Sequence, residues 1–220
     1  MRVLPVDLNR DYEAVISEAC QILRAGGTII YPTDTVYGLG ANACDSVAVE
    51  KVFQIKQRPR SKPLPVLVRN LEWAKELAYI DKKQEKILQA IWPGPVTVIL
   101  PKREHVSPLV VANGVTIGLR VADFPLVDRL LGKFGYPLTA TSTNLVGQAQ
   151  ARDSNKILAT FAELSKKPNL FIDAGILPVT EPSTVLDLTG EEPKILRVGP
   201  ANPGKLLKLL QEVVWADPHF

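Results

Sequence analysis

The sequence predicts an α/β fold in which a twisted, mixed β-sheet is flanked by helices. Its 220 residues, of which 46% are hydrophobic, are enough to bury the core of one large domain. Short apolar runs typical of strands alternate with segments whose apolar residues follow helical spacing, and no repeat or coiled-coil pattern interrupts them. We therefore expect a single domain over residues 1–210 with a tail at 211–220.

The expected strands are apolar runs bounded by turn-forming residues. Residues 2–6 could form a short first strand. About eight strands are expected in the rest of the chain, at residues 28–31, 64–68, 96–100, 115–121, 137–141, 170–173, 183–188 and 195–198.

Six or seven helices are expected, as a rough count, from capping side chains, prolines and helical spacing. Asp7 or Asn9 would cap the first helix, and Gly26 would end it. Asp45 would cap the second helix, and Asp153 a later one that ends near residue 164. The other helices are expected at residues 71–77, 81–91, 125–131 and 203–215.

A polar loop and a basic run are the most informative stretches. The loop at residues 32–38 places hydroxyls, one carboxylate and a glycine where a buried strand ends, and ligand sites gather at such strand ends in α/β folds. The run at residues 56–63 holds four cations, and no Asp or Glu occurs between Glu50 and Glu72. Its prolines restrict the loop, which favours a phosphate site. The alternative is a solvated basic loop, because runs of charge usually face water.

Hydroxyl, amide and guanidinium groups recur at later strands. Ser142 and Asn144 follow one strand and Ser183 begins another. Arg120 is expected to point outward from the strand at 115–121, and Arg197 lies near the end of the last strand. Each residue alone is more often a turn, a cap or a surface side chain. Together they are typical of a site for a polyanion beside a hydroxylated small molecule.

Several classes of protein are disfavoured by composition. No apolar run reaches the ~20 residues that span a bilayer, and the N-terminus lacks the long apolar region of a signal peptide, so we expect a cytosolic protein. Cys20 and Cys44 lack a CxxC spacing, so two buried or half-buried thiols are expected rather than a disulfide or a zinc site. His105 and His219 are the only histidines, which disfavours a catalytic triad and a histidine-rich metal centre.

The segment at residues 199–206 nearly matches the P-loop pattern GxxxxGK[ST]. Leu206 stands where that pattern needs a magnesium-binding hydroxyl, and Pro200 and Pro203 remove amide donors from the phosphate cradle. We expect an ordinary strand-to-helix turn there. No GxGxxG pattern occurs, which disfavours a dinucleotide site.

A series of motifs carries a resemblance to a known family. They are YPTDTVYGL at residues 31–39, KQR at 56–58, KPL at 62–64, WPGPVT at 92–97, STN at 142–144, STV at 183–185 and LRVG at 196–199. In order and spacing, the chain resembles the YrdC/Sua5 family from about residue 9 to residue 205. It looks like the short, stand-alone form without the additional Sua5 domain.

The resemblance implies an L-threonylcarbamoyladenylate synthase, a nucleotidyltransferase with a twisted mixed sheet around a concave, positively charged site. Such an enzyme joins L-threonine, bicarbonate or carbon dioxide, and ATP into threonylcarbamoyl-AMP and pyrophosphate. Partner proteins then transfer the threonylcarbamoyl group to adenosine 37 of tRNA as the t6A modification. Direct tRNA binding is left open, and no membrane is expected as a partner. Mg²⁺ would be carried chiefly by the ATP phosphates, with no metal ligand assigned to a protein side chain.

The resemblance also assigns residues to the two substrates. Lys56 and Arg58 would be catalytic. ATP would be bound by Lys56, Arg58, Lys62, Ser142, Asn144 and Arg197. L-Threonine would be bound by Thr35, Tyr37, Arg120, Thr141 and Ser183, with Arg120 pairing with the carboxylate.

The chain departs from the family pattern at four places. Leu67 and Phe124 replace histidines found in many members, and Thr141 stands where a proline or another small residue often precedes the S-x-N motif. The segment at residues 147–153 replaces a G-x-P-S-P-T-like stretch on the nucleotide side.

Two other functions are compatible with the sequence. A basic RNA-binding module would use the same positive surface, although the basic run contains no aromatic residue on which a base could stack. A related domain in hydrogenase maturation makes a carbamoyl-adenylate from carbamoyl phosphate. Turnover of carbamoyl phosphate without threonine would indicate that activity.

Overall fold

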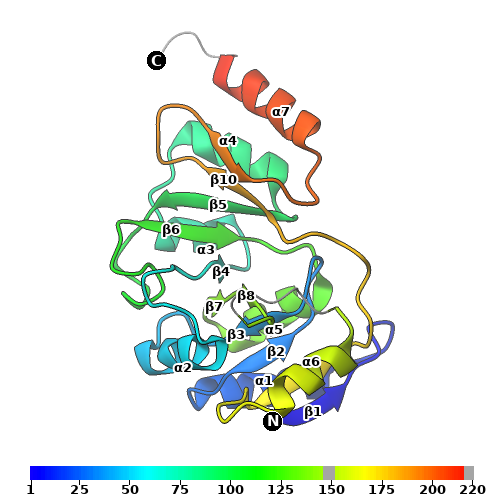
Figure 1. The fold of residues 1–220 in the computed structure, drawn as a ribbon. Helices are drawn as coiled ribbons and strands as arrows, with labels where there is room; N and C mark the ends of the chain where they lie inside the picture. Colours follow the sequence, from blue (N-terminus) through cyan, green and yellow to red (C-terminus); the bar gives the residue numbers. More distant parts are fainter. Residues whose placement is uncertain (146–151, 216–220) are drawn as a thin grey trace.

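The computed structural model describes residues 1–145 and 152–215. Within this part of the chain, eleven strands form two mixed sheets with seven helices packed around them (Figure 1). The mixed α/β class expected from the sequence is confirmed. The strands are divided between two sheets, however, where the sequence led us to expect one.

The first sheet has five strands in the order β1-β9-β2-β3-β8. Its parallel centre is formed by β9, which pairs with β1 on one side and β2 on the other, while β3 and β8 are antiparallel. The strands are β1 (Arg2–Pro5), β9 (Leu170–Asp173), β2 (Ile29–Tyr31), β3 (Gly38–Gly40) and β8 (Thr141–Ser142).

The second sheet has six strands in the order β11-β10-β5-β6-β4-β7. Parallel pairs β10/β5 and β4/β6 alternate with antiparallel pairs. The strands are β11 (Lys194–Arg197), β10 (Thr184–Asp187), β5 (Val96–Pro101), β6 (Thr116–Arg120), β4 (Val66–Leu67) and β7 (Leu138–Thr139).

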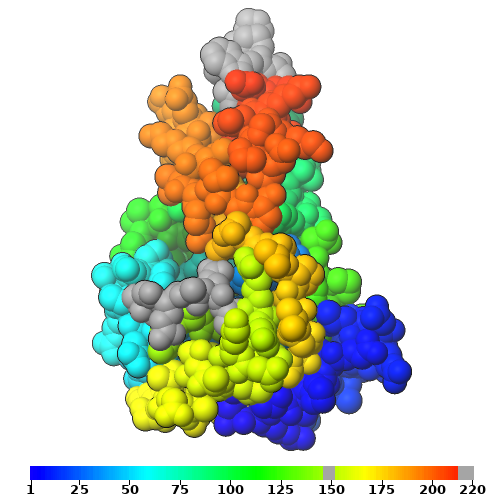
Figure 2. Space-filling model, turned by 45° about the vertical axis from the view of Figure 1, so that its right-hand side comes forward, coloured from blue at the N-terminus to red at the C-terminus, as the bar shows by residue number. Residues whose placement is uncertain are grey.

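The helices cover the sheets in groups. Helix α1 packs on α5 beside the first sheet, whereas α4 packs on α7 beside the second (Figure 1). The bounds are α1 (Glu13–Arg24), α2 (Ser46–Lys56), α3 (Leu71–Leu77), α4 (Lys82–Ile91), α5 (Pro125–Phe134), α6 (Ser154–Ala162) and α7 (Pro203–Trp215). The C-terminal strands and helix, orange to red, lie at the opposite end of the molecule from the N-terminal segment, blue (Figure 2).

Two clusters of buried apolar side chains form the core. The larger joins α2, α3, α4 and α7 to strands of both sheets, and includes the fully buried Ile30, Leu39 and Val98. The smaller lies between α1 and α5 and includes Ile16 and Leu130, which are also fully buried. Burial of such side chains stabilises the fold by roughly 1.5–3 kcal/mol for each large one.

Local capping signals predicted several helix starts correctly. Asp45 accepts hydrogen bonds from two backbone N–H groups of α2, Asp153 accepts one at the start of α6, and Asp81 forms a capping box with Gln84. The predicted caps of α1 are wrong. Neither Asp7 nor Asn9 caps this helix, because it begins at Glu13, whose N–H is bonded by the nearer carboxylate of Asp11.

Strand β3 was not expected from the sequence, because its Gly-Leu-Gly composition is unfavourable for a strand. Its glycines lie against the ring of Tyr31 on the neighbouring strand. A Cβ atom on Gly40 would come within 2.6 Å of that ring, so the close packing requires glycine. Tyr31 in turn donates a hydrogen bond from its hydroxyl to the Thr139 carbonyl, which ties the two sheets together.

The chain passes between the sheets at three places. The segment at residues 41–65 makes the first crossing, from β3 to β4. The segment expected as one strand at residues 137–141 is divided, with β7 in the second sheet and β8 in the first. The segment at residues 174–183 makes the third crossing, from β9 to β10. All three crossings contribute residues to the cavity described below.

Candidate active site

A cavity of about 160 Å³ lies where the two sheets meet. It is lined by all three crossing segments, the first of which includes the basic run. The loop after β2, strand β5 and the ends of β6 and β11 complete the lining. The lining residues are Thr35, Val36, Arg58, Pro65, Thr97, Arg120, Ala140, Thr141, Ser142, Pro182, Ser183 and Arg197. Seven residues that the sequence assigned to the site are therefore brought together, although they are spread over more than 160 positions of the chain.

Arg120 ends β6 and has a side chain that is only 8% exposed. The expectation that it points outward is wrong, because a carboxylate inside the protein balances its charge. Its Nη2 lies 2.5 Å from Oδ1 of Asp34, Nη1 donates to Oγ1 of Thr35 at 2.9 Å, and Nε donates to the Gly94 carbonyl at 3.1 Å. A buried guanidinium needs such partners, since an unpaired charge is costly to bury.

Asp34 was not among the assigned site residues. The signal that could have found it is its position between Thr33 and Thr35 in the polar loop, where it is the one carboxylate. The loop is held by Oγ1 of Thr33, which accepts the N–H groups of Thr35 and Val36. Consecutive residues, Asp34 and Thr35, therefore both bind Arg120.

Four buried hydroxyl groups line the cavity. They belong to Thr35, Thr97, Thr141 and Ser183. Thr97 was not assigned from the sequence, although it closes the WPGPVT motif, and its Oγ1 lies 2.8 Å from Oγ of Ser183. Because each hydroxyl can donate and accept, this group can read a ligand that carries both kinds of hydrogen-bonding group.

Two further guanidinium groups border the cavity. Arg58 is half-buried and donates to the Lys62 and Pro63 carbonyls, which holds the basic run in a closed turn. Arg197 donates through Nε and Nη2 to the Ser183 carbonyl. Burial lowers the pKa of Arg58, and burial together with the positive charge of Arg120 lowers that of Arg197. The site thus concentrates positive charge that an anionic ligand would relieve.

Lys56 lies behind the cavity, at the end of α2. Its side chain is buried, and its ammonium group donates to the Ser142 carbonyl at 2.5 Å and also to the Asn144 carbonyl. Burial, together with the positive charge of Arg58, lowers its pKa to about 7. Ser142 bonds Asn144 through their side chains at 2.5 Å. In this structure Lys56 holds the S-x-N turn, and Ser142 is the member of this group that lines the cavity.

Two further assigned residues, besides Lys56 and Asn144, are not brought to the cavity wall. Lys62 is exposed at the surface on the basic run. Tyr37 is fully buried, where its ring packs edge-on against Phe171 and its hydroxyl donates to the Gly175 carbonyl and accepts from the Ala174 N–H. Desolvation by burial raises the pKa of this hydroxyl. Tyr37 therefore supports the crossing after β9 from within the core.

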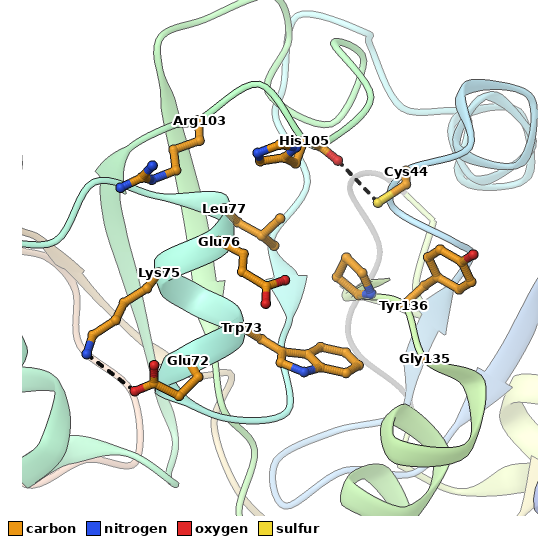
Figure 3. A pocket seen from close by; sticks show the side chains of 11 residues that line it. Cys44, Glu72, Trp73, Lys75, Glu76, Leu77, Arg103, His105, Gly135 and Tyr136 are labelled. Carbon is orange, nitrogen blue, oxygen red and sulfur yellow. Dashed lines mark hydrogen bonds and ion pairs between the residues drawn. The ribbon is translucent and has the colours of Figure 1, made fainter.

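A larger cavity of about 730 Å³ contains none of the assigned residues (Figure 3). It lies beside α3, which contributes Trp73, Glu76 and Leu77, and its other side includes Cys44 and Tyr136 (Figure 3). Charges of both signs line it, with Lys75 paired to acidic neighbours. It lacks the set of guanidinium and hydroxyl groups that distinguishes the smaller cavity.

The two cysteines agree only in part with expectation. Both thiols are free, and Cys20 is buried, but Cys44 is exposed because it precedes α2 at the surface. Among the described residues, no group of three or more His, Cys, Asp or Glu could hold a metal ion. Residues 199–202 lie in the turn between β11 and α7, and residues 203–206 begin α7, with Leu206 buried in the core.

No helix within the described part of the chain has the length and apolar character needed to cross a membrane.

The Sua5/YciO/YrdC family model, described as "Telomere recombination", matches residues 21–199. The chain belongs to the Sua5/YciO/YrdC family. The family suggested by the sequence motifs is therefore confirmed, and the match includes all of the residues that line the cavity.

Two threonylcarbamoyl-AMP synthases are similar to this Sua5/YciO/YrdC chain. The relative from Pyrococcus abyssi is 34% identical over 197 residues, which cover 89% of this chain and 57% of the relative. The relative from Bacillus subtilis is 33% identical over 206 residues, which cover 93% of this chain and 57% of the relative. The chain thus spans little more than half the length of these relatives. The crystal structure of P. abyssi Sua5 complexed with L-threonine matches with a TM-score of 0.88 and 31% identity, covering 95% of this chain and 61% of that one.

The departures of this Sua5/YciO/YrdC member from the family pattern fall in different environments. Leu67 is buried in the smaller core cluster, and Phe124 packs against that cluster just before α5. Thr141 lies in the cavity wall. In the divergent segment at 147–153, residues 147–151 lie outside the described residues. In the expected tail at 211–220, residues 211–215 belong to α7, and residues 216–220 lie outside the described residues.

Proposed function

We propose that the chain is an L-threonylcarbamoyladenylate synthase. The proposal depends mainly on the cavity at the junction of the two sheets, where three guanidinium groups and five hydroxyl groups, four of them buried, converge. The similarity to threonylcarbamoyl-AMP synthases supports it, as does the match to a relative's structure that holds L-threonine. We propose in addition a catalytic domain at residues 1–210 with a tail at 211–220, and a cytoplasmic location.

The cavity suits a small amino acid better than a nucleotide. Its volume of about 160 Å³ equals that of roughly five water molecules at about 30 Å³ each. Two of the five N–H bonds of Arg120 have no partner among the described residues, and they would bind the threonine carboxylate. The hydroxyls of Thr35, Thr141 and Ser183 would bind the side chain and amino group of the same ligand.

ATP would extend from this cavity toward the basic run. Arg58 and Arg197 would neutralise its phosphates, Ser142 and Asn144 would contact the nucleotide, and Lys62 would add positive charge at the surface. The buried Lys56 would act on ATP through its charge and through the S-x-N turn that it holds. Mg²⁺ would be bound to the ATP phosphates and would help to neutralise them. These side chains supply positive charge and hydrogen bonds, and none of them is assigned the role of a strong base.

The chemistry requires no such base at the transfer step. The amino group of threonine forms a bond to carbon dioxide and loses a proton, which gives an N-carboxylate. An oxygen of this carboxylate then bonds to the α-phosphorus of ATP while the bond to the β-phosphate oxygen breaks, and pyrophosphate leaves. In-line placement and neutralisation of charge are the main contributions that such a transfer needs. The product would supply the threonylcarbamoyl group that partner proteins attach to adenosine 37 of tRNA.

Replacement of the two substrate-facing arginines tests the proposal. Arg58→Ala should lower kcat/KM for ATP by roughly 30- to 1000-fold, since loss of a desolvated charge partner costs about 2–4 kcal/mol. Arg120→Lys should raise KM for threonine and change KM for ATP little, because lysine keeps the charge beside Asp34 but lacks the bidentate fork. Steady-state pyrophosphate release, with each substrate varied in turn, measures both effects.

Arg60→Ala is the matched control for Arg58→Ala. Arg60 lies on the same run, but its side chain is 66% exposed and pairs with Glu50 at the surface. Surface pairs contribute little, so this variant should turn over like the unaltered protein. Two outcomes would contradict the assignment of Arg58 and Arg120 to different substrates. One is an equal loss of kcat/KM in all three variants, and the other is that Arg58→Ala and Arg120→Lys each change the KM values for ATP and threonine equally.

A further inference from the structure

The ion pair between Asp34 and Arg120 is the one pair of opposite charges buried at the cavity among the described residues. The side chains are 13% and 8% exposed, and the Oδ1 to Nη2 distance is 2.5 Å. The second oxygen of Asp34 accepts the backbone N–H of Asp123 at 3.3 Å, in the turn between β6 and α5. Asp34 therefore connects the polar loop after β2 to two places on the β6 segment. One is Arg120 at the end of the strand, and the other is the turn that follows it.

These contacts determine which way the guanidinium faces. One N–H each of Nε, Nη1 and Nη2 is directed to Gly94, Thr35 and Asp34. A planar group held at three of its five donors cannot rotate, so the remaining two N–H bonds keep a fixed direction. Without Asp34, the Nη2 end would lose its partner, and the group would be free to turn about the bonds that remain.

The carboxylate also changes the charge balance of the site. Arg58, Arg120 and Arg197 border one cavity, and burial together with the positive charge of Arg120 lowers the pKa of Arg197. Asp34 neutralises one of these three charges. Its removal would leave three like charges around the cavity, and their repulsion would push Arg120 away from its present place.

We propose that Asp34 is a positioning residue that holds Arg120 for the carboxylate of the amino acid substrate. This inference rests on the proposed function, in which Arg120 binds threonine. Asp34 itself does not contact the substrate, and it acts by fixing the two free N–H bonds of Arg120 in direction. Because the two donors are already fixed in direction, the Arg120 side chain loses less conformational entropy when the substrate binds.

The kinetic test compares Asp34→Asn with Asp123→Asn. Asp34→Asn keeps the shape of the side chain and removes its charge, and we expect KM for threonine to rise at least about tenfold while KM for ATP changes less than about twofold. Asp123→Asn removes an equal charge from an exposed side chain and keeps the backbone N–H that Asp34 accepts, so its KM for threonine should not change. Asp34→Glu, which restores the charge on a longer side chain, should recover part of the loss.

A second measurement follows Arg120 without any substrate. The ¹⁵N NMR signals of its guanidinium, assigned by their loss in Arg120→Lys, should show slow Nη rotation in the unaltered protein and faster rotation in Asp34→Asn. A protein that shows no threonine-dependent turnover would contradict the proposed function, and these signals would still decide the role of Asp34. Unchanged rotation in a folded Asp34→Asn variant, or an equal rise of both KM values, would overturn the positioning role.

Discussion

Lys56 shows how one buried cation makes stability depend on pH. Its pKa in the folded protein is about 7, whereas a lysine in an unfolded chain titrates near 10.4. Between these values the unfolded chain holds a proton that the folded protein has released. The free energy of unfolding therefore rises with pH across this window, and the gain is lost as pH falls toward 7.

Lys56→Met should abolish this contribution. As pH rises from 7 to 9, the unfolding free energy of the unaltered protein should increase relative to that of the variant. The increase should be at most about 1.4 kcal/mol per pH unit. Urea unfolding at pH 7, 8 and 9 measures it. Lys83→Met, at an exposed position on α4, is the control and should show the same difference at every pH. A difference for Lys56→Met that does not vary with pH would contradict the prediction.

Residue types in the site were predictable, but their partners were not. Hydroxyl and cationic groups at strand ends and the family motifs pointed to Arg120 and Ser183. The sequence did not reveal that Arg120 is buried, because its partner Asp34 lies 86 positions away along the chain. Thr97 was missed for the same reason, since its contact with Ser183 also joins distant segments.

At the scale of elements, the close approach of β10 and the end of β11 builds one side of the cavity. A Cβ atom on Gly199 would lie 2.1 Å from the Pro182 carbonyl oxygen and 2.5 Å from the Thr184 nitrogen. The Gly199 N–H also donates to Oγ1 of Thr184. These contacts leave no room for a side chain beside Ser183.

Gly199→Ala should therefore destabilise the protein by about 1–3 kcal/mol, the usual cost of overpacking. Gly190→Ala is the control, because its Cβ would approach no atom closer than 3.9 Å. Urea unfolding of the two variants gives the comparison. Equal stability of the two proteins would show that the β10 and β11 segments can separate without cost.

Elements with local signals were predicted well, and those that depend on distant packing were not. Asp45 and Asp153 cap helices because their carboxylates bond N–H groups two or three residues away. Strand β3 forms because its glycines fit against Tyr31 and it pairs with β2 and β8. The split of residues 137–141 into β7 and β8 depends on two different sheets, which no local pattern records.

At the scale of the whole molecule, the site exists because the chain crosses three times between two sheets. The crossings bring residues 58 and 65, 140–142 and 182–183 to one cavity. The expectation of a single sheet concealed this arrangement, although the α/β class and the family were predicted. The order of strands depends on long-range pairing, and the spacing of apolar residues does not encode it.

The mass of the nucleotide product distinguishes a threonylcarbamoyl-AMP synthase from the two other candidate functions. The protein is incubated with ATP, Mg²⁺, L-threonine and ¹³C-bicarbonate, and parallel reactions omit threonine or replace it with carbamoyl phosphate. We predict threonylcarbamoyl-AMP that is one mass unit heavier than the product from unlabelled bicarbonate, and no adenylate without threonine. An adenylate formed from carbamoyl phosphate without threonine, or no turnover by a folded protein that binds tRNA in a salt-dependent manner, would contradict the account.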